Sequence, residues 1–130
     1  MDAIQQFLAQ KRFAVVGASA DRAKYGNKVF RCYQQHGLHA VPVNPKDAIV
    51  EGSRAFSMLS KVPSKIDAVS IITPPKVTES VIDEAGKLGI KHVWMQPGAE
   101  SPAAIEKAKA LGMNVIAGGP CLLVALGFRE

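Results

Sequence analysis

The chain has 130 residues, 48% of them hydrophobic and 21% charged, which is typical of one globular domain and excludes a disordered or fibrous protein. Its two cysteines, Cys32 and Cys121, belong to no CxxC or Cys/His cluster, so we expect neither a disulfide framework nor a metal site. The longest apolar run, Cys121–Phe128, is too short to cross a bilayer, and the N-terminus lacks the positive charge of a secretory signal. We therefore expect a cytoplasmic protein with a single domain over residues 1–130.

The charge of the chain is unevenly distributed. The formal net charge is +5, and residues 1–65 carry 10 basic and 4 acidic side chains while residues 66–130 carry 6 and 7. A basic first half predicts a patch that faces an anion, for which a small phosphorylated ligand is sufficient. Aromatic residues make up only 6% of the chain, which disfavours a nucleic-acid groove. We expect a small-molecule ligand, no nucleic acid and no membrane, and a protein partner remains open.

Apolar runs alternate with amphipathic stretches along the whole chain, and this order predicts a parallel sheet covered by helices. The predicted strands, rich in Val and Ile as in strands buried on both faces, are Phe13–Val16, Ala40–Val43, Ala68–Ile72, His92–Met95 and Asn114–Ile116. The predicted helices are Asp2–Gln10, Gly26–His36, Lys76–Leu88 and Pro102–Leu111. The stretch Lys46–Ser60 is expected to hold an edge strand at Ile49–Val50 and a helical turn near Phe56–Leu59.

These elements predict an α/β, Rossmann-like, doubly wound three-layer sandwich with a mainly parallel five-stranded sheet. Right-handed crossovers place Phe13–Val16 centrally, with Ala40–Val43 on one side and Ala68–Ile72 on the other. The strand order reverses there, and ligands of such sheets bind beyond the carboxyl ends of the strands at that switch point. The loops that follow the strands are therefore the candidates for a binding site.

The first loop runs from Gly17, Ala18 and Ser19 to Gly26, between a strand and a helix. A glycine at the end of the strand allows a tight turn, and amides at the start of the next helix can bind phosphate oxygens, with Arg22 and Lys24 adding charge. The loop departs from GxGxxG because its glycines are nine residues apart. Ordinary turn glycines with two solvated basic residues are the alternative interpretation.

The second loop begins with Asn44, Pro45 and Lys46, where a classical NAD site has an acidic residue for the ribose. No acid stands at these three positions, which disfavours NAD. Lys46 suits a phosphate on the ribose, either the 2′-phosphate of NADP or the 3′-phosphate of coenzyme A. A simple Asn-Pro turn with a solvated lysine is equally consistent with the sequence.

The third loop contains Thr73, Pro74 and Pro75, and the fourth contains Gln96. Two prolines present a rigid apolar edge without amide donors, which suits packing against an adenine or a ribose. The same residues can begin a helix, with Thr73 as N-cap and Pro74 at the first helical position. Gln96 gives the fourth loop an amide side chain.

Candidate catalytic groups are few. His36, His39 and His92 are expected outside the crevice, and Ser19 has no evident His or acidic partner. Cys121 follows the last strand, so its thiol either lies on the ligand-bearing rim or is a buried packing group.

The chain contains five motifs in this order: Val16-Gly17-Ala18-Ser19 with Arg22 and Lys24, Asn44-Pro45-Lys46, Thr73-Pro74-Pro75, Trp94-Met95-Gln96-Pro97-Gly98-Ala99 and Gly119-Pro120-Cys121. Together they resemble the motifs of the small, stand-alone CoA-binding domain proteins. These proteins are similar to the N-terminal domain of the succinyl-CoA ligase alpha subunit. The resemblance implies a Rossmann-like fold that binds coenzyme A, with Gly17, Ala18 and Ser19 cradling phosphate. It also implies that Arg22, Lys24 and Lys46 supply charge and that Thr73, Pro74, Pro75 and Gln96 line the cofactor.

The leading hypothesis is noncovalent binding of coenzyme A or an acyl-CoA at the carboxyl ends of the strands, by a carrier, sensor or accessory module without catalysis of its own. A pantetheine arm that runs toward Cys121 would allow a mixed disulfide between the two thiols. The alternatives are a small NADP-dependent oxidoreductase and a Rossmann scaffold for protein interaction.

Overall fold

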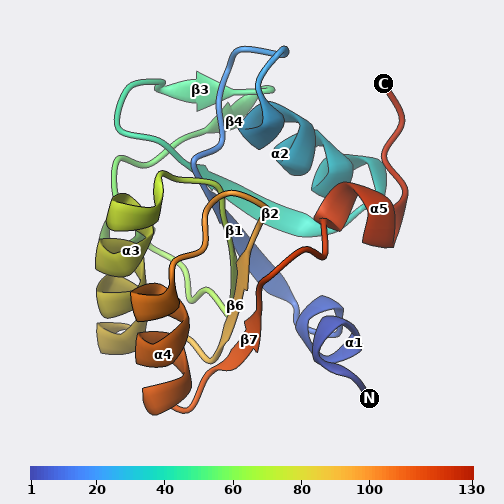
Figure 1. Ribbon diagram of the computed structural model, residues 1–130. Coiled ribbons are helices and arrows are strands. Elements are labelled where there is room, and N and C mark those ends of the chain that lie inside the picture. The colour runs from blue at the N-terminus through green and yellow to red at the C-terminus, as the bar shows by residue number, and fades with distance from the viewer.

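The computed structural model describes residues 1–130, and its centre is a five-stranded, entirely parallel sheet with the strand order β2-β1-β5-β6-β7 (Figure 1). The strands are β1 (Arg12–Val16), β2 (His39–Val43), β5 (Ala68–Ile71), β6 (His92–Met95) and β7 (Asn114–Ile116). The helices are α1 (Ala3–Leu8), α2 (Tyr25–Gln35), the 3₁₀-helix η1 (Leu59–Lys61), α3 (Pro75–Lys87), α4 (Pro102–Ala110) and α5 (Leu122–Leu126). The predicted fold is confirmed, and β1 lies between β2 and β5 as expected, although β5 is the middle strand of the five.

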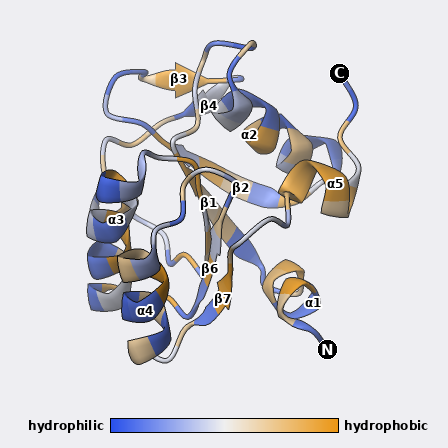
Figure 2. Cartoon of the chain, viewed as in Figure 1, coloured by the Kyte–Doolittle hydropathy of each residue, from blue (hydrophilic) through white to orange (hydrophobic).

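Helices cover both faces of the sheet, as a doubly wound fold requires (Figure 1). Successive residues of a strand point to opposite faces, so Ala14 and Val16 pack with α3 and α4 in one buried cluster while Phe13 and Val15 pack with α1, α2 and α5 in another. Figure 2 shows the apolar residues gathered in the strands and the polar ones on the outer turns of α3 and α4. The strands can therefore be hydrophobic along their whole length, as the sequence predicted.

The α3/α4 face of the sheet is packed with aliphatic side chains and the opposite face with aromatic ones. On the aromatic face, Trp94 and Phe7 meet edge to face with their ring centroids 5.4 Å apart. Tyr33 is fully buried there, and its hydroxyl lies 2.6 Å from the hydroxyl of Ser70 on β5. This contact pairs two polar groups that would otherwise be buried without a partner.

Several local expectations are corrected by the structure. Thr73 is not the N-cap of α3, because Pro74 has the extended backbone of that position and Pro75 is the first helical residue. The expected edge strand belongs to a separate antiparallel hairpin of β3 (Ile49–Val50) and β4 (Ser53–Arg54). The expected helical turn lies later, at η1, because Phe56 instead forms a parallel bridge with Val43. The helix α5 was not expected.

Candidate functional site

Two adjoining hollows of 540 and 640 Å³ lie at the carboxyl ends of β1, β2 and β5, where the strand order reverses. They share five lining residues, Gly17, Lys24, Asn44, Lys46 and Ile72. The two hollows are therefore continuous, and we call them together the switch-point groove. The smaller hollow is its loop half, and the larger one, which extends between η1 and α3, is its apolar half.

Gly17 and Ile72 line the groove where β1 and β5 end, and glycine makes the turn after β1 possible. Ile72 still donates its amide to the carbonyl of Val16 at 2.8 Å, but Gly17 turns away with a φ of +98°. A Cβ atom on Gly17 would lie 1.9 Å from the carbonyl oxygen of Ile72, and one on Gly26 would lie 2.0 Å from the carbonyl oxygen of Gly17. Only glycine fits at these two positions, which explains their spacing of nine residues without a full GxGxxG motif.

The loop half of the groove carries amide donors and two lysines. The amide N–H groups of Ser19, Tyr25 and Gly26 make no hydrogen bond within the protein, and all three residues line this half. Lys24 and Lys46 line it as well and are exposed. Free amides at a helix start beside two cations form an arrangement that suits phosphate oxygens.

Two acidic residues, Asp21 and Asp47, also line the loop half. Asp47 Oδ2 accepts hydrogen bonds from the amide of Ala20 at 3.0 Å and from Asn44 Nδ2 at 3.2 Å, and Asp21 Oδ1 accepts from the amide of Ala23 at 3.0 Å. Both carboxylates therefore stabilise the loop. Asp47 directly follows Lys46, so an acid does lie close to the end of β2. The absence of an acid at Asn44, Pro45 and Lys46, which disfavoured NAD, does not extend to the next residue.

Asn44 connects the two loops of this half. Its Nδ2 donates to the carbonyl of Ala18 at 2.6 Å, while its Oδ1 accepts from the amides of Lys46 at 2.6 Å and Asp47 at 3.1 Å. The Asn44 side chain thereby fixes the turn that presents Lys46. This is a positioning role that the sequence did not distinguish from direct ligand contact.

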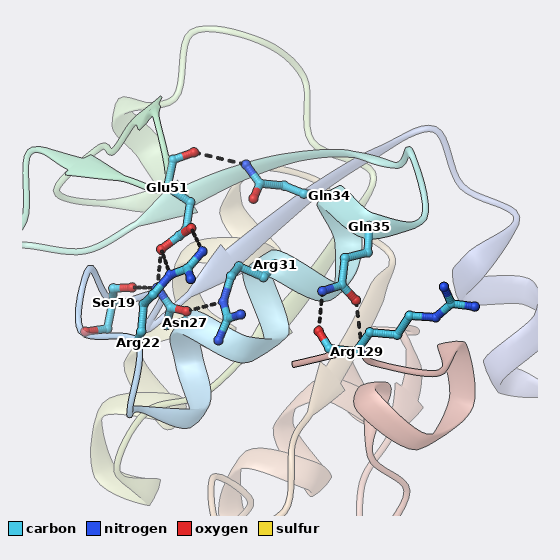
Figure 3. Close-up of polar contacts among 8 residues, drawn as sticks. All are labelled: Ser19, Arg22, Asn27, Arg31, Gln34, Gln35, Glu51 and Arg129. Carbon is cyan, nitrogen blue, oxygen red and sulfur yellow. Dashed lines mark hydrogen bonds and ion pairs between the residues drawn. The ribbon is translucent and has the colours of Figure 1, made fainter.

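Arg22 lies outside the groove. Its guanidinium makes a two-point contact with the carboxylate of Glu51 on the β3–β4 turn, through Nε at 3.2 Å and Nη2 at 2.9 Å (Figure 3). Asn27 donates to the same carboxylate at 3.0 Å and to the carbonyl of Ser19 at 2.8 Å. Hydrogen bonds from Arg22 and Asn27 lower the pKa of Glu51 to about 2. We call Arg22, Asn27 and Glu51 the hairpin latch, because they tie the β3–β4 hairpin to the first loop.

The apolar half lies between the end of β2, the segment before η1 and the start of α3. Thr73 and Pro74 line it, as expected, and so does Pro45, whereas Pro75 does not. The side chains of Met58 and Val77 also line it and are 50% and 47% exposed. The sequence did not identify these two: Met58 follows a parallel bridge between Phe56 and Val43 that no local pattern predicts, and Val77 lies in the first turn of α3.

Gln96 and Cys121 both contact the Tyr25 hydroxyl and do not line the groove. Gln96 is fully buried, and its Oε1 accepts from the Tyr25 hydroxyl at 3.0 Å and from the amide of Leu122 at 2.9 Å. The Tyr25 hydroxyl also lies 2.7 Å from Cys121 Sγ, and burial, followed by this contact, raises the pKa of Tyr25. Tyr25, which lines the groove, therefore connects Cys121 and Gln96 to it. The mixed disulfide of Cys121 with coenzyme A stays a prediction.

Of the predicted site residues, the structure brings eight together as lining of the groove: Gly17, Ser19, Lys24, Asn44, Pro45, Lys46, Thr73 and Pro74. Ala18 is buried beneath them, and Arg22, Pro75, Gln96 and Cys121 do not line the groove. No group of three or more His, Cys, Asp or Glu side chains lies close enough together to hold a metal ion. No helix has both the length and the apolar character needed to cross a membrane.

Comparison with known families is consistent with this geometry. Residues 11–127 match the family described as CoA binding domain, and the chain belongs to this family. The expected resemblance is thereby confirmed. The alpha subunit of ADP-forming acetate–CoA ligase II from Pyrococcus furiosus is 31% identical over 124 residues, which cover 87% of this chain and 27% of that protein. The chain thus spans about a quarter of the length of this curated relative.

Solved structures give the same result. A conserved hypothetical protein from Pyrococcus furiosus has a TM-score of 0.83 and 34% identity, and the match covers 89% of this chain and 99% of that one. An acetyl-coenzyme A synthetase from Ca. Korarchaeum cryptofilum, solved in complex with phosphate and ADP, has a TM-score of 0.77 and 29% identity, over 88% of this chain and 27% of that one. The fold therefore occurs both in chains of similar length and as one part of much longer synthetases.

Proposed function

We propose that the chain binds coenzyme A or an acyl-CoA noncovalently in the switch-point groove. The observation that carries the proposal is the division of one continuous groove into two chemically different halves. Free amides line one half, apolar side chains line much of the other, and Lys24 and Lys46 line both where the two halves meet. A ligand with phosphates at one end of a nucleoside and an aromatic base at the other matches this division.

The residues of the groove fit such a ligand group by group. The amides of Ser19, Tyr25 and Gly26, together with Lys24 and Lys46, would hold phosphate oxygens. Thr73, Pro74 and the apolar side chains beyond them would contact the ribose and the base. Coenzyme A, when bound, supplies the thiol that carries an acyl group.

Within this proposal the chain acts as a carrier, sensor or accessory module in the cytoplasm. Family membership supports the ligand class, but the ligase activity named for the longer relatives belongs to proteins of which this chain spans only a part. Tyr25, Gln96 and Cys121 would lie near the acyl-bearing end only if the pantetheine arm passes the loop half. We assign them no catalytic role.

Calorimetric titration with coenzyme A, NADP and NAD tests the proposal. Coenzyme A should bind most tightly. Family membership favours it over NADP, and NAD is disfavoured because Asp47, the acid nearest the end of β2, is already hydrogen bonded to Ala20 and Asn44. NADP binding that equals or exceeds that of coenzyme A would contradict the proposal and favour a small oxidoreductase. No binding of any of the three would favour an interaction scaffold.

A further inference from the structure

The apolar half of the groove contains one acidic side chain, Glu84, beside its aliphatic lining and the polar residues Lys24, Asn44, Lys46, Ser57 and Thr73. Its 640 Å³ hollow is lined by Val43, Met58, Leu59, Pro74, Val77 and Val81, and Glu84 is the only acidic residue there. Met58 and Val77 leave about half of their surface uncovered in a chain whose other large hydrophobic residues are mostly buried. Exposed apolar surface lining a hollow is typical of a ligand site.

Glu84 is held in place through one of its two carboxylate oxygens. It lies on α3 three residues after Val81, on the same face of the helix. Its Oε2 accepts a hydrogen bond from the amide of Ser60 in η1 at 3.2 Å. Oε1 makes no hydrogen bond, and no cation pairs with this carboxylate. A half-buried carboxylate thus keeps a free acceptor in a hollow whose lining is largely aliphatic around it.

We propose that Glu84 selects adenine among the purine bases by accepting a hydrogen bond from its exocyclic amine. The inference rests on the proposed function, since it assumes that the base of the ligand occupies the apolar half. A carboxylate can only accept hydrogen bonds, and adenine presents an amine donor at C6, whereas hypoxanthine and guanine present a carbonyl acceptor there. Two acceptors facing each other in an apolar hollow leave both without a partner, which disfavours the wrong base.

The experiment compares coenzyme A with its deaminated analogue, in which hypoxanthine replaces adenine. Calorimetry on the wild-type chain should give at least about tenfold tighter binding of coenzyme A. In Glu84→Gln, one amide oxygen can still accept from the Ser60 amide while the NH₂ group donates to a C6 carbonyl. The preference should therefore fall to near equality or reverse. Because each ratio is measured within one variant, incomplete folding of that variant does not change it.

Asp83→Asn is the matched control. Asp83 neighbours Glu84 on α3, its removal changes the net charge by the same amount, and it pairs with Lys107 at 3.1 Å without lining the groove. This variant should keep the wild-type preference for adenine.

The outcomes separate the two proposals. Coenzyme A that binds the wild type without preference for adenine, or a preference that Glu84→Gln leaves unchanged, overturns the role of Glu84 alone. If coenzyme A does not bind the wild-type chain, both the proposed function and this inference are overturned.

Discussion

The two halves of the switch-point groove differ in how far their side chains are already held by contacts within the protein. In the loop half, the latch side chains and Asn44 hold the first loop, the β3–β4 hairpin and the turn after β2 together. In the apolar half, Met58 and Val77 contact little and remain half exposed. We infer that the loop half contributes preorganised geometry for phosphates, while the apolar half contributes surface that a ligand would bury.

The largest expected effect comes from a change that breaks the loop half. In Gly17→Ala the new Cβ would lie 1.9 Å from the Ile72 carbonyl oxygen, on a residue with φ of +98°. We expect a loss of about 3 kcal/mol or more in the free energy of unfolding, measured by urea denaturation, and loss of coenzyme A binding. Gly37→Ala is the control, because Gly37 also has a positive φ, +67°, but open space around it. That variant should lose only roughly 1 kcal/mol, and equal losses in the two variants would contradict the steric account.

The next effect separates the lysines of the groove from the arginine of the latch. Lys24→Ala and Lys46→Ala should each weaken coenzyme A binding by roughly 1–3 kcal/mol, because each removes a charged donor from the loop half. Arg22→Ala should weaken it less, since the Arg22 guanidinium is bound to Glu51. Titrations with coenzyme A and dephospho-CoA measure both points. If one of the two lysines binds the 3′-phosphate, the variant that lacks this lysine should bind dephospho-CoA almost as well as the wild type does. A loss of affinity in Arg22→Ala equal to that in the lysine variants would show that the latch opens on binding.

A smaller effect tests the apolar half. Val77→Ala removes two methyl groups from the groove lining and should weaken coenzyme A binding by about 1 kcal/mol. It should leave the free energy of unfolding nearly unchanged, because Val77 is 47% exposed and alanine favours a helix. Val124→Ala on α5, where the side chain is 83% exposed, is the matched control and should change neither quantity. A stability loss in Val77→Ala without weaker binding would assign Val77 to the core instead.

The smallest effect concerns the latch and depends on pH. The folded-state pKa of Glu51, about 2, lies below the ordinary value of 4.5, so the ionised carboxylate stabilises the fold above about pH 4.5, and this contribution is lost as the pH falls toward 2. Glu51→Gln should therefore cost about 1 kcal/mol at pH 7, a modest amount because Arg22 is exposed to solvent. Urea denaturation of both proteins between pH 7 and 3 should give a difference that shrinks on acidification. A difference that stays constant over this range would exclude the ionised carboxylate as its source.

The sequence predicted the sheet well because buried parallel strands have a local signature. Runs such as Phe13–Val16 and Ala68–Ile71 are nearly continuous in apolar residues, and Gly37, Gly89 and Gly112, which follow three of the helices, have a positive φ. The loop residues Gly17, Lys24 and Lys46 were identified for the same reason, since Gly17 and Lys24 adjoin such elements and Lys46 lies three residues after β2. The site could be predicted wherever its position followed from the end of a strand.

The remainder of the site depends on contacts between distant segments. Arg22 and Glu51 are 29 positions apart, and only the β3–β4 hairpin, which lacks a strong strand pattern, brings them together. Met58 reaches the groove because Phe56 bridges to Val43, and the sequence expected a helical turn there instead. The assignment of Arg22 to the ligand followed its charge, but charge alone does not indicate which partner a side chain meets.

The register of β1 also has a consequence for how the chain folds. β1 pairs with β5, and its first residue, Arg12, donates its amide to a carboxylate 55 positions later, on Asp67. During synthesis, the middle of the sheet therefore cannot close until about half of the chain has been made, and β1 has only β2 to pair with before then. Long-range parallel pairing of this kind is slow because a long loop must close first. Folding should accordingly be limited by the docking of β5 onto β1 rather than by the formation of any helix.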